Sequence, residues 1–207
     1  MRNTLLAILI LLCSCSEQTP NENETFIVPI RKKPLYDTLG NVPPKPPPIQ
    51  TYYLPSNFII DTAGHLYFYQ QQQYGWFCGT GIEWDTPPEF INLKPKDIVQ
   101  LPIENIDSFI KLNIINLESP YRLVAIASLR DTVQSVGLSK IMSTFKDTTN
   151  HIKWLFRKAT QEETIVLNYK QSGREYYSDD VQWDSTKIHF PNLETNIKFT
   201  PPKVQEE

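Results

Sequence analysis

The chain has 207 residues, of which 40% are hydrophobic and 12% aromatic, a composition typical of a folded globular protein. Its formal net charge is −3 and its pI is about 5.7, so it lacks the basic surface that binds nucleic acid. We therefore expect one domain, at most with a small appendage, and no nucleic-acid partner.

The first residues have the pattern of an export signal. Arg2 gives a positive start, and the run Leu5–Leu12 is apolar and carries no charge. This run is much shorter than the roughly 20 apolar residues that a membrane-spanning helix needs. The sequence therefore predicts the core of a signal peptide rather than a transmembrane helix.

The residues that end this run, Leu12-Cys13-Ser14-Cys15, resemble a bacterial lipobox. The resemblance implies that residues 1–14 are a signal peptide cut in front of Cys15 and that the Cys15 thiol is acylated. Cys13 fits less well, because Leu12 would then occupy a place where the family has a small side chain. We expect a protein anchored to a membrane through Cys15, in the bacterial cell envelope, at the outer membrane or cell surface. An ordinary cleaved signal or a short amphipathic anchor is the alternative.

A proline-rich linker is expected over residues 15–50. Its last part, Pro43–Pro48, favours the extended polyproline conformation, which rises about 3.1 Å per residue. Directly after a lipid anchor it would act as a semi-rigid spacer, and a ligand for a proline-binding groove is the alternative. The apolar stretch Thr25–Ile30 lies within this linker, and the sequence leaves open whether it adds an edge strand to the folded body.

A single domain is expected over 51–200, followed by a flexible tail over 201–207. Asn57–Asp61 and His65–Tyr69 are two β-rich runs separated by a Thr-Ala-Gly turn, which predicts a hairpin. Asp97–Leu101 follows as a short strand. The next segment, Glu104–Leu112, is predicted to be a helix because its apolar residues recur at helical spacing.

Further strands and helices are predicted after residue 120. The nearly continuous apolar run Arg122–Ser128 is typical of a strand buried on both faces. A stripe of apolar residues over 138–145 predicts a helix, which Gly137 is expected to separate from a first turn containing Val133 and Val136. The segment 152–157 alternates as a half-buried strand does.

The last elements are expected to be a second hairpin, with a loop at Thr160–Glu163 before a strand at Thr164–Tyr169, and a turn at Gly173. Ser178–Asp180 is then predicted to be a helical turn and Lys187–Phe190 a short strand. This mixed order of elements predicts an α+β fold, with two or three short helices on one face of a mainly antiparallel sheet.

The element order from Phe58 to Phe156 resembles the periplasmic domain of biopolymer-transport energising proteins, in which a proline-rich spacer also follows a membrane segment. The apolar segment here is shorter than a membrane span and lacks the intramembrane acidic residue of that family. The resemblance implies a fold and carries no function.

An aromatic loop after the first hairpin is the leading candidate for a ligand site. Its rings lie near three glycines and suit a sugar or peptide face: Tyr74, Trp76, Phe77 and Trp84, with Tyr67 and Tyr69 just before them. The alternative is that these rings fill core volume.

Glu83 and Asp85 flank Trp84, so in an extended segment both carboxylates point the same way. Two facing carboxylates are what glycoside hydrolysis requires, which makes them weak catalytic candidates. Carboxylates that are simply solvated are the commoner case.

Cys78 is the cysteine left for the folded body, either as a buried thiol or as a nucleophile that needs a histidine nearby. The histidines show no metal-ligand spacing, so no metal site is expected: His65, His151 and His189. An acidic group near the end, Asp179, Asp180 and Asp184, lacks the glycine of a familiar calcium loop. Helix capping by Ser178 and a solvated face explain this group better.

No phosphate-cradling glycine loop, serine elbow or paired-cysteine motif is present, so no cofactor is expected. The sequence favours a non-enzymatic, lipid-anchored binding module that contacts a protein or a cell-wall component through the aromatic loop. The alternatives are an envelope glycan hydrolase that uses Glu83 and Asp85, and an immunity or inhibitor protein.

Overall fold

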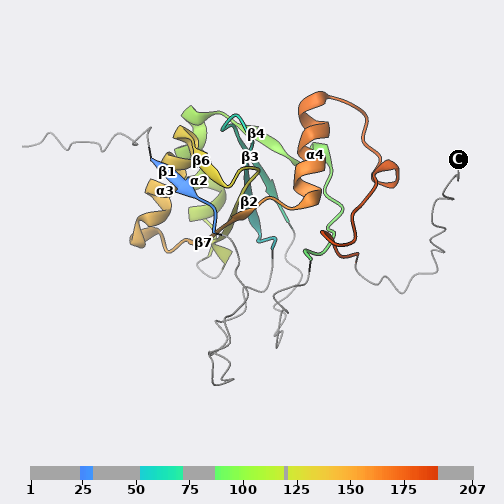
Figure 1. Ribbon diagram of the computed structural model, residues 1–207. Helices are drawn as coiled ribbons and strands as arrows, with labels where there is room; N and C mark the ends of the chain where they lie inside the picture. Colours follow the sequence, from blue (N-terminus) through green and yellow to red (C-terminus); the bar gives the residue numbers. More distant parts are fainter. Residues whose placement is uncertain (1–23, 30–51, 72–86, 119–120, 191–207) are drawn as a thin grey trace, which may run out of the picture. The chain divides into compact units, whose positions relative to one another are not determined.

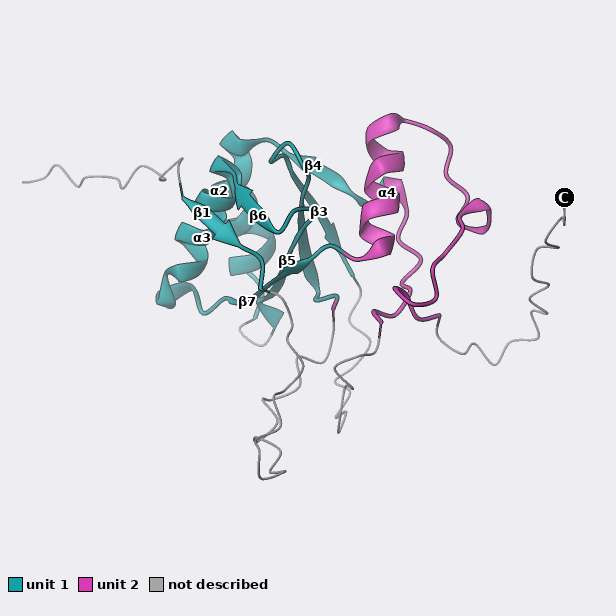
Figure 2. Cartoon of the chain, viewed as in Figure 1, with its two compact units in different colours: residues 1–33, 53–76, 96–159 teal, residues 34–52, 77–95, 160–207 magenta. Residues whose placement is uncertain are grey.

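The computed structural model describes residues 24–29, 52–71, 87–118 and 121–190 (Figure 1). The chain divides into two compact units (Figure 2). Unit 1 contains residues 1–33, 53–76 and 96–159, and unit 2 contains residues 34–52, 77–95 and 160–207. The predicted signal peptide, Cys15, the proline run and the tail lie outside the described residues.

Unit 1 is built on a five-stranded sheet with the order β4-β3-β2-β5-β7. The strands are β2 (Ser56–Ile60), β3 (Leu66–Gln70), β4 (Val99–Leu101), β5 (Leu123–Ser128) and β7 (Lys153–Lys158). The neighbours β2–β3 and β3–β4 are antiparallel, whereas β2–β5 and β5–β7 are parallel. The predicted hairpin and the predicted buried strand are both confirmed, and β5 lies in the middle of the parallel half.

Two helical segments cover one face of this sheet. The first runs through η2 (Ile103–Asn105), α2 (Ile106–Ile110) and the π-helical turn η3 (Lys111–Ile115), and the second is α3 (Val136–Lys146). Their apolar stripes meet the sheet in one core, which includes Phe58, Ile60, Phe68, Ile106, Ile110, Ile126, Leu138, Ile141 and Phe145. The predicted α+β class and the helix near 104–112 are therefore confirmed.

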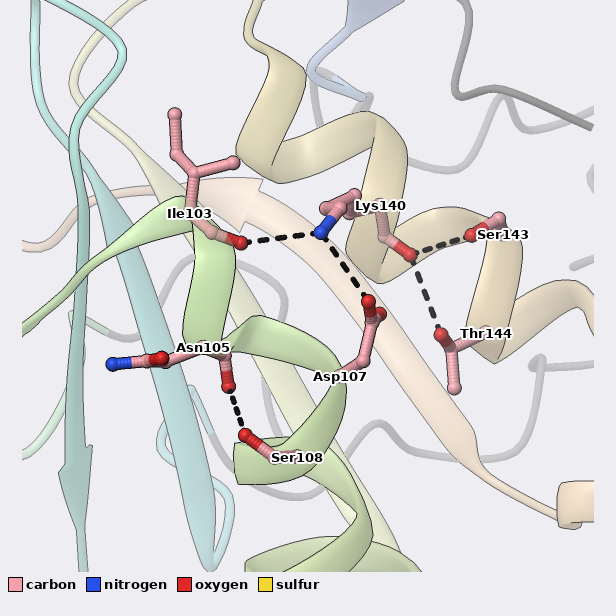
Figure 3. Close-up of polar contacts among 7 residues, drawn as sticks. All are labelled: Ile103, Asn105, Asp107, Ser108, Lys140, Ser143 and Thr144. Carbon is pink, nitrogen blue, oxygen red and sulfur yellow. Dashed lines mark hydrogen bonds and ion pairs between the residues drawn. The ribbon is translucent and has the colours of Figure 1, made fainter.

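Lys140 joins the two helical segments at their exposed side. Its Nζ donates to the Ile103 carbonyl at 3.3 Å and pairs with Asp107 Oδ2 at 3.2 Å (Figure 3). The carbonyl of Lys140 accepts hydrogen bonds from the hydroxyls of Ser143 and Thr144 within α3. An exposed pair of this kind contributes little to stability, so the apolar core must hold the helices in place.

The start of α3 differs from the prediction. Val133 lies in a strand, β6 (Thr132–Gln134), and the helix begins directly afterwards, with Ser135 as its N-cap accepting from Leu138 N. Gly137 is the second residue of the helix instead of a break before it. A Cβ at Gly137 would lie 3.4 Å from Ile106 Cδ1, so the glycine allows α3 to approach α2 closely.

The N-terminal stretch that the sequence left open forms a strand. β1 (Thr25–Ile27) pairs antiparallel with β6 in a separate two-stranded sheet (Figure 1). It does not extend the edge of the main sheet. Among the strands that the structure describes, in both sheets, three of the five pairs are antiparallel.

The edge strand β7 does not alternate as predicted. Trp154 is 41% exposed, whereas the side chain of Arg157 is buried and its guanidinium lies over the Tyr53 ring at 5.5 Å. A sheet edge leaves one side of a large ring open, and an arginine that contacts an aromatic face can be buried. Side-chain type alone therefore misassigned both residues. A short 3₁₀ turn, η5 (Thr148–Asn150), precedes this strand.

Unit 2 contains a helix where the sequence predicted a second hairpin. α4 (Gln161–Ser172) begins with a capping box, in which the Thr160 hydroxyl accepts from Glu163 N and Glu163 Oε2 accepts from Thr160 N. Gly173 ends it in the left-handed conformation, at φ 64°. The β-branched run at 164–166 favours a strand by propensity, but the Thr-x-x-Glu motif in front of it specifies a helix start. The hairpin prediction was wrong because it ignored that motif.

Replacing Thr160 with Ala removes the hydroxyl that caps α4. We expect the free energy of unfolding to fall by about 1 kcal/mol, the usual cost of losing an N-cap. Thr160→Ser keeps the hydroxyl and is the matched control. Urea unfolding followed by circular dichroism measures both variants, and equal stability of the Ala and Ser variants would contradict the capping role.

Candidate functional site

The predicted aromatic loop, from Tyr74 through Trp84, lies outside the described residues, as do Cys78, Glu83 and Asp85. These site predictions therefore stay predictions. The two tyrosines just before the loop are described: Tyr67 and Tyr69 lie on β3 and are buried. For this pair, the alternative that the rings fill core volume is confirmed.

Unit 2 contains a second group of aromatic rings, Phe90, Trp183 and Phe190, called here the aromatic cluster. The Phe90 centroid lies 5.0 Å from that of Trp183 and 4.9 Å from that of Phe190. Trp183 and Phe190 are 6.3 Å apart, nearly edge to face. Phe190 is 36% exposed, and the other two rings are partly buried. The cluster thus presents apolar aromatic surface to the solvent.

Backbone pairing brings the two phenylalanines of the aromatic cluster together. Glu89 and His189 form a parallel bridge, in which Phe90 N donates to the His189 carbonyl at 2.7 Å and His189 N donates to the Pro88 carbonyl at 2.8 Å. The predicted strand at 187–190 is reduced to this single bridge. The pairing places Phe90 and Phe190 beside each other although 99 residues separate them along the chain.

The indole of Trp183 is held by a neighbouring turn. Its Nε1 donates to the Ser178 carbonyl at 2.9 Å, at the start of η6 (Ser178–Asp180). This turn confirms the predicted helical turn, but the Ser178 side chain does not cap it. Because the indole N–H is engaged inside the chain, Trp183 offers its ring and not its donor to a ligand.

One residue of the acidic group near Trp183, Asp184, has a structural role. Asp184 Oδ1 accepts from the backbone N and the hydroxyl of Thr186, and Oδ2 pairs with Lys187 Nζ at 3.0 Å. These contacts, chiefly the hydroxyl of Thr186, lower the pKa of Asp184 to about 2. Asp184 is therefore an anion at ordinary pH and a poor proton donor. Asp179 and Asp180 are exposed.

A buried carboxylate organises the segment that leads into the aromatic cluster. Glu162, fully buried at the start of α4, accepts from Ile91 N at 3.0 Å and from Leu93 N at 2.6 Å. Asn92 between these residues has a φ of 57°, which lets both N–H groups face one carboxylate. The carboxylate replaces water for two backbone donors and fixes the course of this segment just after Phe90.

Tyr176 lies near this carboxylate. Its hydroxyl oxygen is buried and has no hydrogen-bond partner among the described residues. Burial raises the pKa of Tyr176 to about 12, and the negative charges of Glu162 and of an ionised Tyr169 add to the effect. Such a group is a neutral phenol over the whole physiological range, which suits packing better than acid–base chemistry.

In unit 1, the best-defined acid–base pair lies at the tip of the β2–β3 hairpin. Asp61 Oδ2 lies 3.0 Å from His65 Nδ1, and Asp61 Oδ1 accepts from the N–H groups of Ala63 and His65. Gly64 completes the turn with a φ of 88°, and its carbonyl accepts from the Ser135 hydroxyl. The carboxylate thus closes the turn, as aspartate commonly does.

No metal site or membrane-spanning helix is found in the described ranges. Within them, no three or more His, Cys, Asp or Glu side chains gather where they could hold a metal ion. His151 has a φ of 50° and ends η5, well separated along the chain from the hairpin and bridge that hold the other two histidines. Of the helices so described, none has the length and apolarity that crossing a membrane requires.

Comparisons with known proteins give no family. No family model matches the chain, and neither the curated proteins nor the solved structures contain a significant match. A functional hypothesis must therefore come from the chain's own residues.

The sequence reasoning missed the aromatic cluster. Phe190 falls in the short strand predicted at 187–190, and no predicted site includes Phe90 or Trp183. Sequence periodicity gives no signal for a single β-bridge between distant segments. The two segments share only an order of apolar, polar and aromatic residue, Pro88-Glu89-Phe90 and Ile188-His189-Phe190, which does not by itself predict a contact.

The raised pKa of Tyr176 gives a test by pH. Between pH 10 and about 12 the unfolded chain loses this proton and the folded chain keeps it, so ionisation favours unfolding. The stability that Tyr176 contributes is complete below pH 10 and is lost as the pH rises towards 12. We expect Tyr176→Phe to lose less stability between about pH 9 and about pH 11 than the wild type in urea unfolding.

Tyr177→Phe is the matched control, because that ring is largely exposed. Removing a buried hydroxyl that has no partner among the described residues should also leave Tyr176→Phe at least as stable as the wild type near neutral pH. A variant that is less stable at neutral pH, with an unchanged alkaline profile, would contradict this account of Tyr176.

Proposed function

We propose that this protein is a lipid-anchored cell-envelope protein whose folded part is a non-enzymatic binding module for another protein. Two features support the proposal: the lipobox-like Leu12–Cys15 and the partly exposed aromatic cluster of unit 2. The single observation that carries the binding role is the aromatic cluster, since exposed aromatic rings held by rigid backbone are typical anchors of protein interfaces.

The geometry of the aromatic cluster favours a protein partner over a glycan. Its rings meet edge to face and the Trp183 N–H is engaged with Ser178, so no indole donor is left for a sugar hydroxyl. Apolar side chains of a protein need no such donor.

The anchor is tested by exchanging each cysteine of the lipobox. Cys15→Ser should move the protein from the membrane fraction to the soluble fraction, because the acylated thiol is lost. Cys13→Ser should remain in the membrane fraction and is the matched control. Fractionation with metabolic labelling by a palmitate analogue measures both, and the reverse pattern would show that the lipid is on the other thiol.

The binding role is tested at Trp183. Trp183→Ala should weaken binding of a partner identified by crosslinking in the native envelope by more than about 2 kcal/mol, roughly 30-fold in Kd, as for a central interface aromatic. Trp154→Ala removes an exposed tryptophan from unit 1 and should leave the Kd unchanged. Phe190→Ser tests the same cluster at its most exposed ring. If all three variants fold by circular dichroism and bind equally well, the aromatic cluster is not the contact.

A further inference from the structure

The N-terminal strand β1 is bound to unit 1 along its whole length. Its residues pair with β6 in the register Thr25 to Gln134, Phe26 to Val133 and Ile27 to Thr132. Beyond the strand, Val28 N donates to the Asp131 carbonyl at 2.9 Å. The Gln134 amide also donates to the Thr25 hydroxyl at 2.7 Å. The contact therefore involves both backbone and side chains.

Side chains of this segment belong to the core of unit 1. Val28 is 3% exposed and belongs to the main apolar core, and Phe26 packs partly buried against it. Lys146 at the end of α3 pairs with Glu24 at 3.0 Å and lies over the Phe26 ring at 5.7 Å. Because burial of apolar side chains stabilises a fold, this segment is part of the folded unit.

The position of β1 decides how long the tether is. Only residues 16–23, eight in number, separate the predicted lipid site Cys15 from Glu24. At most about 3.3–3.6 Å per residue, this connection reaches about 30 Å. The spacer expected from the sequence, residues 15–50, would reach about 110 Å at ~3.1 Å per residue if all of it adopted the polyproline conformation. The two arrangements differ nearly fourfold in reach.

Along the chain, the proline run follows β1, whereas the predicted lipid site precedes it. Pro29, just after β1, and Tyr53, three residues before β2, both belong to unit 1, and residues 30–51 connect them along the chain. Both ends of this 22-residue segment are therefore fixed on the same unit. A segment closed in this way cannot increase the distance between the unit and its anchor, whatever its own conformation.

We propose that β1 fastens unit 1 close to the membrane, within about 30 Å of the acylated cysteine, and that the proline-rich segment is a closed loop and not a stalk. The inference rests on the proposed lipid anchor at Cys15.

Two insertions of identical sequence separate the loop from the stalk. One places about 20 Gly/Ser residues between Thr19 and Pro20, upstream of β1, and the other places the same residues after Pro44, in the proline run. The full chain, acylated in cells and reconstituted in vesicles, carries a donor dye at Ser143→Cys on α3 in a Cys78→Ser background. Acceptor-labelled lipid headgroups then report the distance from unit 1 to the membrane by energy transfer.

We expect the upstream insertion to lower energy transfer strongly and the proline-run insertion to leave it at the wild-type value. Equal losses from both insertions, or a loss from the proline-run insertion alone, would overturn the proposal. Val28→Asp places a charge in the core at β1 and should release the strand. In that background the proline-run insertion should lower energy transfer as well, and an unchanged value would also count against the fastening role of β1.

The experiment distinguishes failure of the β1 proposal from failure of the proposed lipid anchor. If Cys15 is not acylated, the unmodified chain does not bind the vesicles, and none of the variants gives energy transfer. If the anchor holds but β1 does not fasten the unit, the wild type binds the vesicles and both insertions lower the signal. The two proposals thus fail with different results.

Discussion

The packing of one ring, that of Phe58, holds the parts of unit 1 together. Phe58 lies on β2 and is fully buried. Its centroid is 5.0 Å from Phe68 on β3, 6.4 Å from Phe109 on α2 and 6.2 Å from Phe145 on α3. The hairpin and both helices therefore contact the same ring, at tilted or edge-on angles that aromatic pairs prefer. The strand that carries Phe58, β2, lies between β3 and β5 in the sheet, so Phe58 is at the centre of this core.

The sequence predicted the elements whose signal is local and strong. The β2–β3 hairpin, β5 and the helix around α2 each follow from periodicity, run length or turn residues, and the structure contains all of them. The Thr160–Glu163 capping box was equally local but was read as a loop, because the β-branched residues after it were given more weight. The order of strands in the sheet could not be predicted, because the parallel pairing of β5 with both β2 and β7 joins segments that are far apart in the chain. The candidate site could not be predicted either, because the aromatic cluster depends on a single bridge between Glu89 and His189, and one bridge leaves no pattern in the sequence.

In unit 2, carboxylates that accept hydrogen bonds hold the segments around the aromatic cluster, whereas unit 1 is built on an apolar core. Glu162 binds two backbone N–H groups around Asn92, and Asp184 binds the turn that follows Trp183. Both carboxylates satisfy backbone or hydroxyl donors and so fix the segments that carry Phe90 and Trp183. A partly exposed aromatic surface needs such support, because its own rings bury too little area to hold their positions. The positions that these two carboxylates fix thus explain their presence beside the aromatic cluster.

The same need for support applies to the lipid anchor that we propose at Cys15, which would reach the folded part through β1. Such an anchor would restrain the protein at its first residues, so any pull on the domain would pass through the segment that follows Cys15. With β1 paired to β6 and Val28 in the core, that pull reaches the connection between β5 and α3. On this proposal the proline-rich segment, which follows β1 in the chain, would bear none of the pull. Its length and composition could then change without changing how far unit 1 lies from the membrane, whereas the length of a stalk would set that distance.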